Sequence, residues 1–175
     1  MRIKIYQPLA IHELGKRANQ EDSIYPIVGK ATESDRLFLL CDGMGGHEHG
    51  EVASQGICKS LSSFLLQHAV ASEGLEDKLL SDALAYAYEE LDKLAIAGDS
   101  RQMGTTLTLL YFHSNGCTAA HIGDSRIYHL RPSSHTILYK SRDHSLVYDL
   151  YQAGELTYEE MKTFPQKNVI TRAMI

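Results

Sequence analysis

With 175 residues, of which 43% are hydrophobic and 22% charged, the chain has the size and composition of one globular domain. Its formal net charge of −5 argues against nucleic acid or an anionic membrane as the main partner, because both require a basic surface. No apolar run approaches the ~18 residues of a membrane-spanning helix, and the charged N-terminus is not typical of a signal peptide, so a cytoplasmic location is expected.

The first half of the chain predicts one buried strand and two helices. The apolar run 36–41 ends at Asp42-Gly43 and is typical of a buried strand. Residues 51–70 and 77–97 predict amphipathic helices, since apolar residues recur at steps of three and four. These residues are Ala53, Ile57, Leu61, Phe64 and Leu65 in the first helix, and Leu80, Leu84, Ala87, Leu91 and Leu94 in the second.

The pattern then changes to that of strands. Residues 105–112 are rich in Thr, Leu and aromatic side chains, as strands are. Residues 117–122 and 125–131 predict two strands joined by a hairpin turn at Gly123-Asp124, and 136–140 predict another strand. Because the two helices are adjacent, the order predicts an α+β fold with largely antiparallel sheets.

Two short helices are predicted near the end. The first covers 145–153, with Gly154 at a left-handed C-cap. The second begins at Thr157, which with Glu160 forms a capping-box pattern, and Pro165 ends it. Helices this short predict a small exposed subdomain.

The three cysteines are Cys41, Cys58 and Cys117, and none belongs to a CxxC pair. We expect all three to be buried or inert thiols in a reducing compartment.

Two early segments contain groups suited to phosphate and metal ions. Arg17 precedes Glu21-Asp22, and a guanidinium can grip phosphate while adjacent carboxylates hold a hard cation. From this segment alone, a solvated charged turn is the favoured interpretation. Asp42-Gly-Met-Gly-Gly-His47 follows the buried strand, so its carboxylate is rigidly placed and its glycines let a ligand approach the backbone.

Other interpretations of the second segment stay open. Glu48 stands where a dinucleotide-binding loop needs glycine, and a Walker loop is absent. A zinc site at His47 and His49 lacks a second His or Cys pair. A tight glycine turn with Asp42 as a helix cap explains the segment equally well. The later segments 103–106, 121–126 and 142–145 are each explained alone by packing or turn formation.

Together, these segments resemble the type 2C protein phosphatases, the metal-dependent PPM family, from about Leu14 to the last residue. The motifs are Arg17…Glu21-Asp22, Asp42-Gly-Met-Gly-Gly-His47, Gly104-Thr-Thr106, Gly123-Asp-Ser-Arg126, Asp143-His-Ser145 and Asn168-Val-Ile-Thr-Arg172, and the glycine-rich form is similar to the bacterial branch. The resemblance implies one domain, 1–175, folded as a four-layer α/β/β/α sandwich of two antiparallel sheets flanked by helix pairs. Residues 145–167 would form a flap beside the active site.

The resemblance also implies a metal site for two Mn²⁺ or Mg²⁺ ions, with a third, weaker site. Asp42 would bridge both ions and the Gly43 carbonyl would bind one of them. Glu21 and Asp22 match an acidic pair that binds metal directly or through water, and Asp124 matches a third-site ligand. An oxygen-rich ligand set of this kind suits hard cations.

The implied activity is hydrolysis of phosphoserine and phosphothreonine on proteins by a water that two metal ions activate. Arg17 matches the residue that clamps the substrate phosphate, and no cysteine nucleophile is needed. The expected partners are phosphoproteins, including a serine/threonine kinase or its targets. The alternative is a regulatory or binding module that keeps the fold without full catalysis, and an unrelated zinc or calcium protein explains fewer motifs.

The chain also departs from the family pattern. Met44 stands where some relatives carry a histidine that serves as general acid, which leaves the proton donor unassigned, with His47 nearby in sequence. Two later metal-binding aspartates of the family lie beyond Ile175. We therefore expect the domain to be incomplete at the C-terminus, the chain as written to be weakly active or inactive, and exposed sheet edges to favour a dimer.

Overall fold

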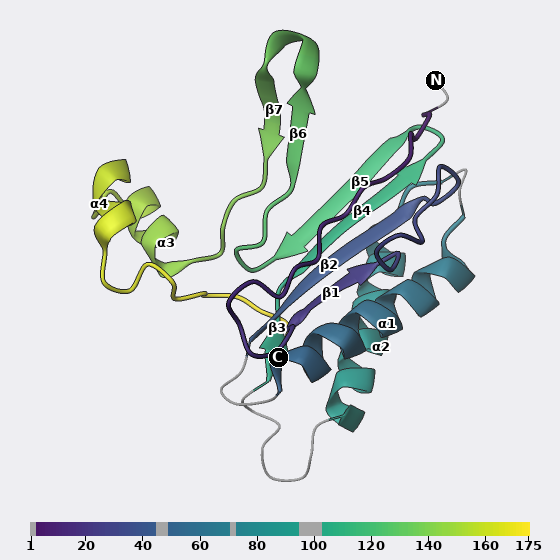
Figure 1. Ribbon diagram of the computed structural model, residues 1–175, viewed down its shortest axis with the longest axis horizontal. Helices are drawn as coiled ribbons and strands as arrows, with labels where there is room; N and C mark the ends of the chain where they lie inside the picture. Colours follow the sequence, from purple (N-terminus) through teal and green to yellow (C-terminus); the bar gives the residue numbers. More distant parts are fainter. Residues whose placement is uncertain (1–2, 45–48, 71–72, 95–102) are drawn as a thin grey trace.

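The computed structural model describes residues 3–44, 49–70, 73–94 and 103–175, which form an antiparallel sheet covered on one face by two helices (Figure 1). The elements in chain order are β1 (Asp22–Tyr25), β2 (Leu37–Met44), α1 (Gly50–His68), α2 (Asp77–Leu94), β3 (Gly104–Thr105), β4 (Leu107–His113), β5 (Gly116–Ile122), β6 (Tyr128–Arg131), a 3-10 turn (Pro132–Ser134), β7 (Thr136–Lys140), α3 (Leu146–Ala153) and α4 (Tyr158–Thr163).

The large sheet has the strand order β1-β2-β4-β5, with β3 also paired to β2, and every pairing is antiparallel. Strands β6 and β7 form a separate two-stranded ribbon. The predicted α+β fold with antiparallel sheets is therefore confirmed. Of the four layers implied by the resemblance, the described residues form the α1–α2 pair and the large sheet, and the β6–β7 ribbon is a separate two-stranded sheet that projects away from it (Figure 1).

The core lies between the large sheet and helix α1, with α2 packed against α1. Along β2, burial alternates as a half-buried strand requires, so that Leu37, Leu39 and Cys41 face the helices. Ile57 and Leu61 of α1 are fully buried against this face. The apolar stripe predicted for α1 thus faces the sheet, and the stripe predicted for α2 packs against α1, although Leu94 at the end of α2 is exposed.

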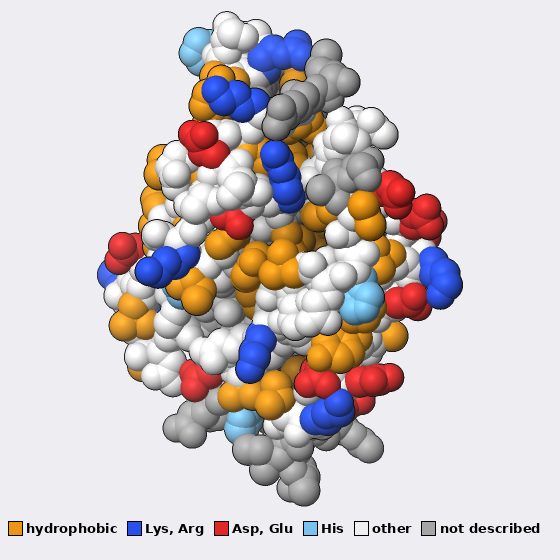
Figure 2. Space-filling model, turned by 90° about the vertical axis from the view of Figure 1, so that its right-hand side faces the viewer, with side chains coloured by type: hydrophobic (Ala, Val, Ile, Leu, Met, Phe, Trp, Pro, Cys, Tyr) orange, Lys and Arg blue, Asp and Glu red, His pale blue; other side chains and the backbone are white. Residues whose placement is uncertain are grey.

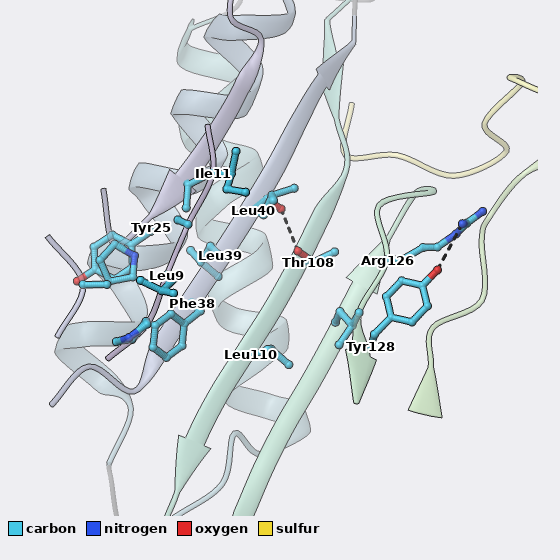
Figure 3. Close-up of a pocket in the computed structure, with 16 residues that line it drawn as sticks. Leu9, Ile11, Tyr25, Phe38, Leu39, Leu40, Thr108, Leu110, Arg126 and Tyr128 are labelled. Carbon is cyan, nitrogen blue, oxygen red and sulfur yellow. Dashed lines mark hydrogen bonds between the residues drawn. The ribbon is translucent and has the colours of Figure 1, made fainter. Parts of the chain in front are cut away.

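The opposite face of the large sheet is also apolar, but it is open. A cavity of about 390 Å³ lies on it, bordered by strands β1, β2 and β4 and by the N-terminal segment that contains Leu9 and Ile11. Figure 3 shows Phe38, Leu40 and Leu110 on the strands beneath it. Leu9 and Ile11 are almost fully exposed, so the N-terminal segment covers this face only in part.

The short helices at the end match their predicted capping. Gly154 has φ 79° at the C-cap of α3, and its N–H donates to the carbonyls of the last turn. Thr157 and Glu160 form the capping box of α4, with the Glu160 carboxylate accepting from the Thr157 N–H at 2.8 Å. Figure 1 shows both helices away from the large sheet, next to each other.

Two predictions about local structure are wrong. Strand β2 extends to Met44, so Asp42 lies within the strand rather than after it, because β1 and β3 pair with residues 42–44. No hairpin joins 117–122 to 125–131, because β5 pairs with β4 and β6 pairs with β7. Of the three cysteines, which were expected to be buried or inert, Cys41 and Cys58 are buried and Cys117 is exposed.

Hydrogen bonds explain why the chain leaves the large sheet at Gly123. Both backbone groups of Gly123 bind His144: its N–H donates to Nδ1 at 3.1 Å, and its carbonyl accepts from the His144 N–H at 3.0 Å. Ile127 then exchanges bonds with Ser141, its N–H donating to the Ser141 hydroxyl at 2.8 Å. These contacts direct the chain toward β7 instead of back along β5.

None of the helices within the described ranges combines the length and the apolar character that crossing a bilayer requires. On the face in Figure 2, basic and acidic side chains are interspersed among hydrophobic ones. The described side chains on this face therefore form no extended basic patch of the kind that binds nucleic acid.

Candidate metal centre

Two carboxylates face each other across the β1–β2 pairing. Asp22 and Asp42 are register partners, and Glu21 immediately precedes β1. Directly opposed residues of antiparallel strands have Cβ atoms about 4.5–5.5 Å apart, so like charges placed there repel each other. The predicted proximity of Asp22 and Asp42 is confirmed, and their role as metal ligands stays a prediction.

The environment of Asp42 disfavours its ionised form. The pKa of Asp42 rises from the ordinary 3.8 to about 6, with burial as the largest cause. The Asp22 carboxylate contributes to the rise through its charge and a hydrogen bond, and Asp124 contributes a smaller part. Arg17 opposes the shift. Three carboxyl groups from β1, β2 and the turn after β5 thus interact electrostatically, with too little nearby positive charge to balance them.

Arg17 lies beside these carboxylates. Its Nη1 is 3.5 Å from the Glu21 Oε2 and 3.9 Å from the Asp42 Oδ1. The Arg17 side chain is 57% exposed, so these contacts leave much of its guanidinium accessible from solvent. An accessible guanidinium next to carboxylates can bind a phosphate that arrives at the same place.

Gly43 is fixed by its close approach to two other backbone segments. Its N–H donates to the Glu21 carbonyl at 3.0 Å. A Cβ added at Gly43 would lie 2.0 Å from the carbonyl oxygen of Gly50, in the first turn of α1. Only glycine fits between β1 and the start of α1, and this contact sets where the end of β2 meets the helix.

Asp124 lies in the turn after β5 and is exposed. It follows Gly123, whose φ of 100° requires glycine and whose backbone is held by His144. The next residue, Ser125, lies 2.7 Å by its Oγ from the Oγ1 of Thr106, and Thr106 also bonds the backbone of Asp42. Contacts of its neighbours, rather than of its own side chain, therefore set the position of Asp124.

Several side chains around this site were not singled out from the sequence. His144 stacks on His121 with ring centroids 4.8 Å apart, and burial lowers the pKa of His144, with the neighbouring charges of His121 and Arg172 adding to this effect. Arg126 and Asp143 form a bidentate pair at 2.7 and 2.6 Å. The motifs that contain these residues were recognised, but sequence spacing could not show that they pair with one another.

Two cavities lie near the site, and neither is lined by Asp22 or Asp42. The cavity of Figure 3 contains no carboxylate, and Arg126 lies at its border. A second cavity, of about 330 Å³, extends from Asp124 to helices α3 and α4 and includes Lys140, Lys162 and Lys167. This second cavity connects the predicted flap, residues 145–167, with the predicted third metal ligand.

The residues present fit a hard divalent cation in part. Burial and mutual repulsion destabilise the charged forms of these carboxylates, and a bound cation would offset both effects. Their oxygen atoms are ligands that suit Mn²⁺ or Mg²⁺. Across residues 3–44, 49–70, 73–94 and 103–175, however, no three His, Cys, Asp or Glu side chains lie close enough together to hold one ion. His47, considered as a proton donor, lies outside the described residues, as do its neighbours Gly45 and Gly46.

Comparison with known proteins identifies the family. Residues 13–161 match the family model described as Protein phosphatase 2C. The chain is 35% identical over 159 residues to the protein phosphatase PhpP of Streptococcus pneumoniae, a match that covers 91% of this chain and 63% of PhpP.

Solved structures agree with this match. The crystal structure of the Mycobacterium tuberculosis serine/threonine phosphatase PstP/Ppp matches with a TM-score of 0.73 and 33% identity, covering 98% of this chain and 66% of that one. The catalytic domain of PstP in complex with two manganese ions matches with a TM-score of 0.69 and 35% identity, covering 90% and 61%.

The chain spans somewhat less than two thirds of the length of PhpP and of these solved structures. Within that span, the family model covers most of the chain, and solved phosphatase structures share its fold. The chain therefore belongs to the protein phosphatase 2C family.

Proposed function

We propose that this protein hydrolyses phosphoserine and phosphothreonine on other proteins in a reaction that depends on Mn²⁺ or Mg²⁺. The observation that carries the proposal is the convergence of Asp22, Asp42 and Arg17 at one edge of the large sheet. A metal-binding carboxylate pair and an accessible guanidinium are the groups that recognition of a phosphate monoester requires.

Each side chain would have a distinct task. Arg17 would hold two oxygens of the substrate phosphate with its guanidinium fork, after exchanging its contacts with Glu21 and Asp42 for contacts with the phosphate. Asp42 would bridge two ions, with Glu21, Asp22 and the Gly43 carbonyl as further ligands from this chain.

Asp124 would hold a third, weaker ion. Bound there, the ions would supply Lewis-acid neutralisation of the phosphate and lower the pKa of the attacking water.

The proposal also covers the extent of the domain and the position of the flap. Residues 1–175 belong to one phosphatase domain, and 145–167 form a flap beside the active site. The cavity between Asp124 and α3–α4 supports this placement, because a substrate polypeptide bound at Asp124 would also reach the flap. A phosphorylated protein is thus the proposed partner.

The proposal is tested on the full-length protein, by turnover of a phosphothreonine peptide with Mn²⁺, with and without excess chelator. The Asp42→Ala variant should lose turnover, because it lacks the bridging carboxylate. Asp82→Ala is the matched control, since the exposed Asp82 lies on α2, where its carboxylate pairs with Lys78 at 3.1 Å. Turnover that survives both the chelator and Asp42→Ala would exclude metal-dependent phosphatase activity, whereas metal binding without turnover would indicate a non-catalytic module.

A further inference from the structure

Thr106 occupies the interruption between β3 and β4, directly opposite Asp42. The pairs Gly43↔Thr105 and Leu40↔Thr108 place Thr106 across from Asp42 in the same register. Thr106 is 1% exposed, and it is one of the few fully buried polar side chains near the carboxylates. Its surroundings are therefore set by protein contacts rather than by water.

The hydrogen bonds between Thr106 and Asp42 depart from a regular ladder. The Thr106 N–H donates to the Asp42 carbonyl at 2.9 Å, as expected for a hydrogen-bonded antiparallel pair. The return bond runs instead from the Asp42 N–H to the Thr106 hydroxyl, at 3.1 Å. The Thr106 carbonyl accepts from the Thr105 hydroxyl at 3.0 Å. A side chain thus replaces a backbone acceptor at the residue proposed to bridge the metal ions.

The same side chain contacts both neighbours of Asp124. The Thr106 Oγ1 lies 2.7 Å from the Ser125 Oγ. On the other flank, a Cβ added at Gly123 would lie 2.6 Å from the Thr106 Cγ2, so Gly123 packs tightly against the threonine methyl. Thr106 therefore contacts the chain immediately before and after Asp124.

We propose that Thr106 is a positioning residue that fixes the separation between Asp42 and Asp124, and with it the spacing of the metal ions these carboxylates hold. The hydroxyl can serve both partners at once, because it has one proton and two lone pairs. The methyl group supplies the second contact, against Gly123. The claim that Thr106 sets the spacing of metal ions rests on the proposed function. The claim that it fixes the separation between Asp42 and Asp124 does not.

Substitutions separate the hydroxyl from the methyl group. Thr106→Val keeps the shape of the side chain but removes both hydroxyl contacts, which leaves the Asp42 N–H without its acceptor. Thr106→Ser keeps the hydroxyl and loses only the methyl. Thr108→Val is the matched control: Thr108 lies two residues further along the chain, in β4, and its hydroxyl makes a long contact, 3.4 Å, to the Leu40 carbonyl on the open face of the sheet (Figure 3).

The first measurement is Mn²⁺ binding by calorimetry. We expect Thr106→Val to weaken Mn²⁺ binding by about 10-fold, the usual effect of removing a group that orients metal ligands. Thr106→Ser should bind within about 3-fold of the unmodified chain, and Thr108→Val should match it. Unchanged binding by Thr106→Val, or an equal loss in Thr106→Ser, would overturn the role assigned to the hydroxyl.

The second measurement uses no metal. Hydrogen exchange of the Asp42 amide, followed by NMR in the presence of chelator, should be about 10-fold faster in Thr106→Val than in Thr108→Val, since one hydrogen bond is lost. If Asp42→Asn binds Mn²⁺ with the same affinity as the unmodified chain, Asp42 is not a metal ligand and the proposed metal site is wrong. The exchange rate of the Asp42 amide then tests by itself whether Thr106 positions Asp42. Equal exchange in the two valine variants would refute that role.

Discussion

In the metal-free protein, Asp42 should destabilise the fold at neutral pH, and Asp42→Asn should therefore increase stability. Burial and the facing Asp22 carboxylate raise the pKa of Asp42 from 3.8 to about 6 in the folded protein. The folded state then binds the proton more tightly than the unfolded state, so stability is lost as pH rises from about 4 through 6. The amide of asparagine does not ionise and is not subject to this loss.

The size of the effect follows from the shift. A rise of about two pKa units corresponds to at most ~3 kcal/mol of unfolding free energy. The Asp42 side chain is 40% exposed, so water screens part of this penalty, and about 1 kcal/mol is expected at pH 7. For a chain of this length, that corresponds to an increase in Tm of about 2–4 °C for Asp42→Asn.

The assay is thermal and urea unfolding of both proteins at pH 4 and pH 7 in excess chelator. The two stabilities should converge at pH 4 and separate at pH 7, with Asp42→Asn the more stable. Saturating Mn²⁺ at 100 times its Kd should stabilise the unmodified protein by about 2.7 kcal/mol and reverse the order. A chelated Asp42→Asn variant that is less stable than the unmodified protein at pH 7, or a difference independent of pH, would refute the reasoning.

Further predictions concern packing, phosphate binding and dynamics. Gly43→Ala should destabilise the fold by ~3 kcal/mol or more in urea unfolding, because its Cβ would lie 2.0 Å from the Gly50 carbonyl oxygen, whereas Gly116→Ala, with its nearest neighbour at 3.6 Å, should have little effect. In the full-length protein, Arg17→Ala should raise KM for a phosphothreonine peptide more than it lowers kcat, and a change confined to kcat would contradict a phosphate-binding role. Amides of α3 and α4 should exchange faster than those of α2, and equal protection would rule out a mobile flap.

Much of the local structure could be read from the sequence. The spacing of Ile57 and Leu61 identified the buried side of α1, because helical periodicity is a property of neighbouring residues. The caps at Gly154 and Thr157 were predictable for the same reason, since a cap satisfies backbone groups within a few residues of itself. Arg17, Asp22 and Asp42 could be selected from their motifs and their chemistry.

Tertiary structure decided how these pieces meet. The register that places Asp22 opposite Asp42 joins segments 20 residues apart. Strand β1 was not predicted from the sequence, and it forms because it pairs with β2. The turn at Gly123 looked like a hairpin, yet contacts with His144 send the chain to a different partner strand. Thr106 was nearly uninformative in the sequence, because its importance lies in two contacts, Asp42 and Ser125, that are far from it along the chain. Periodicity and capping act over a few residues and can be read locally, whereas strand pairing and side-chain packing depend on which distant segments compete for the same edge or contact.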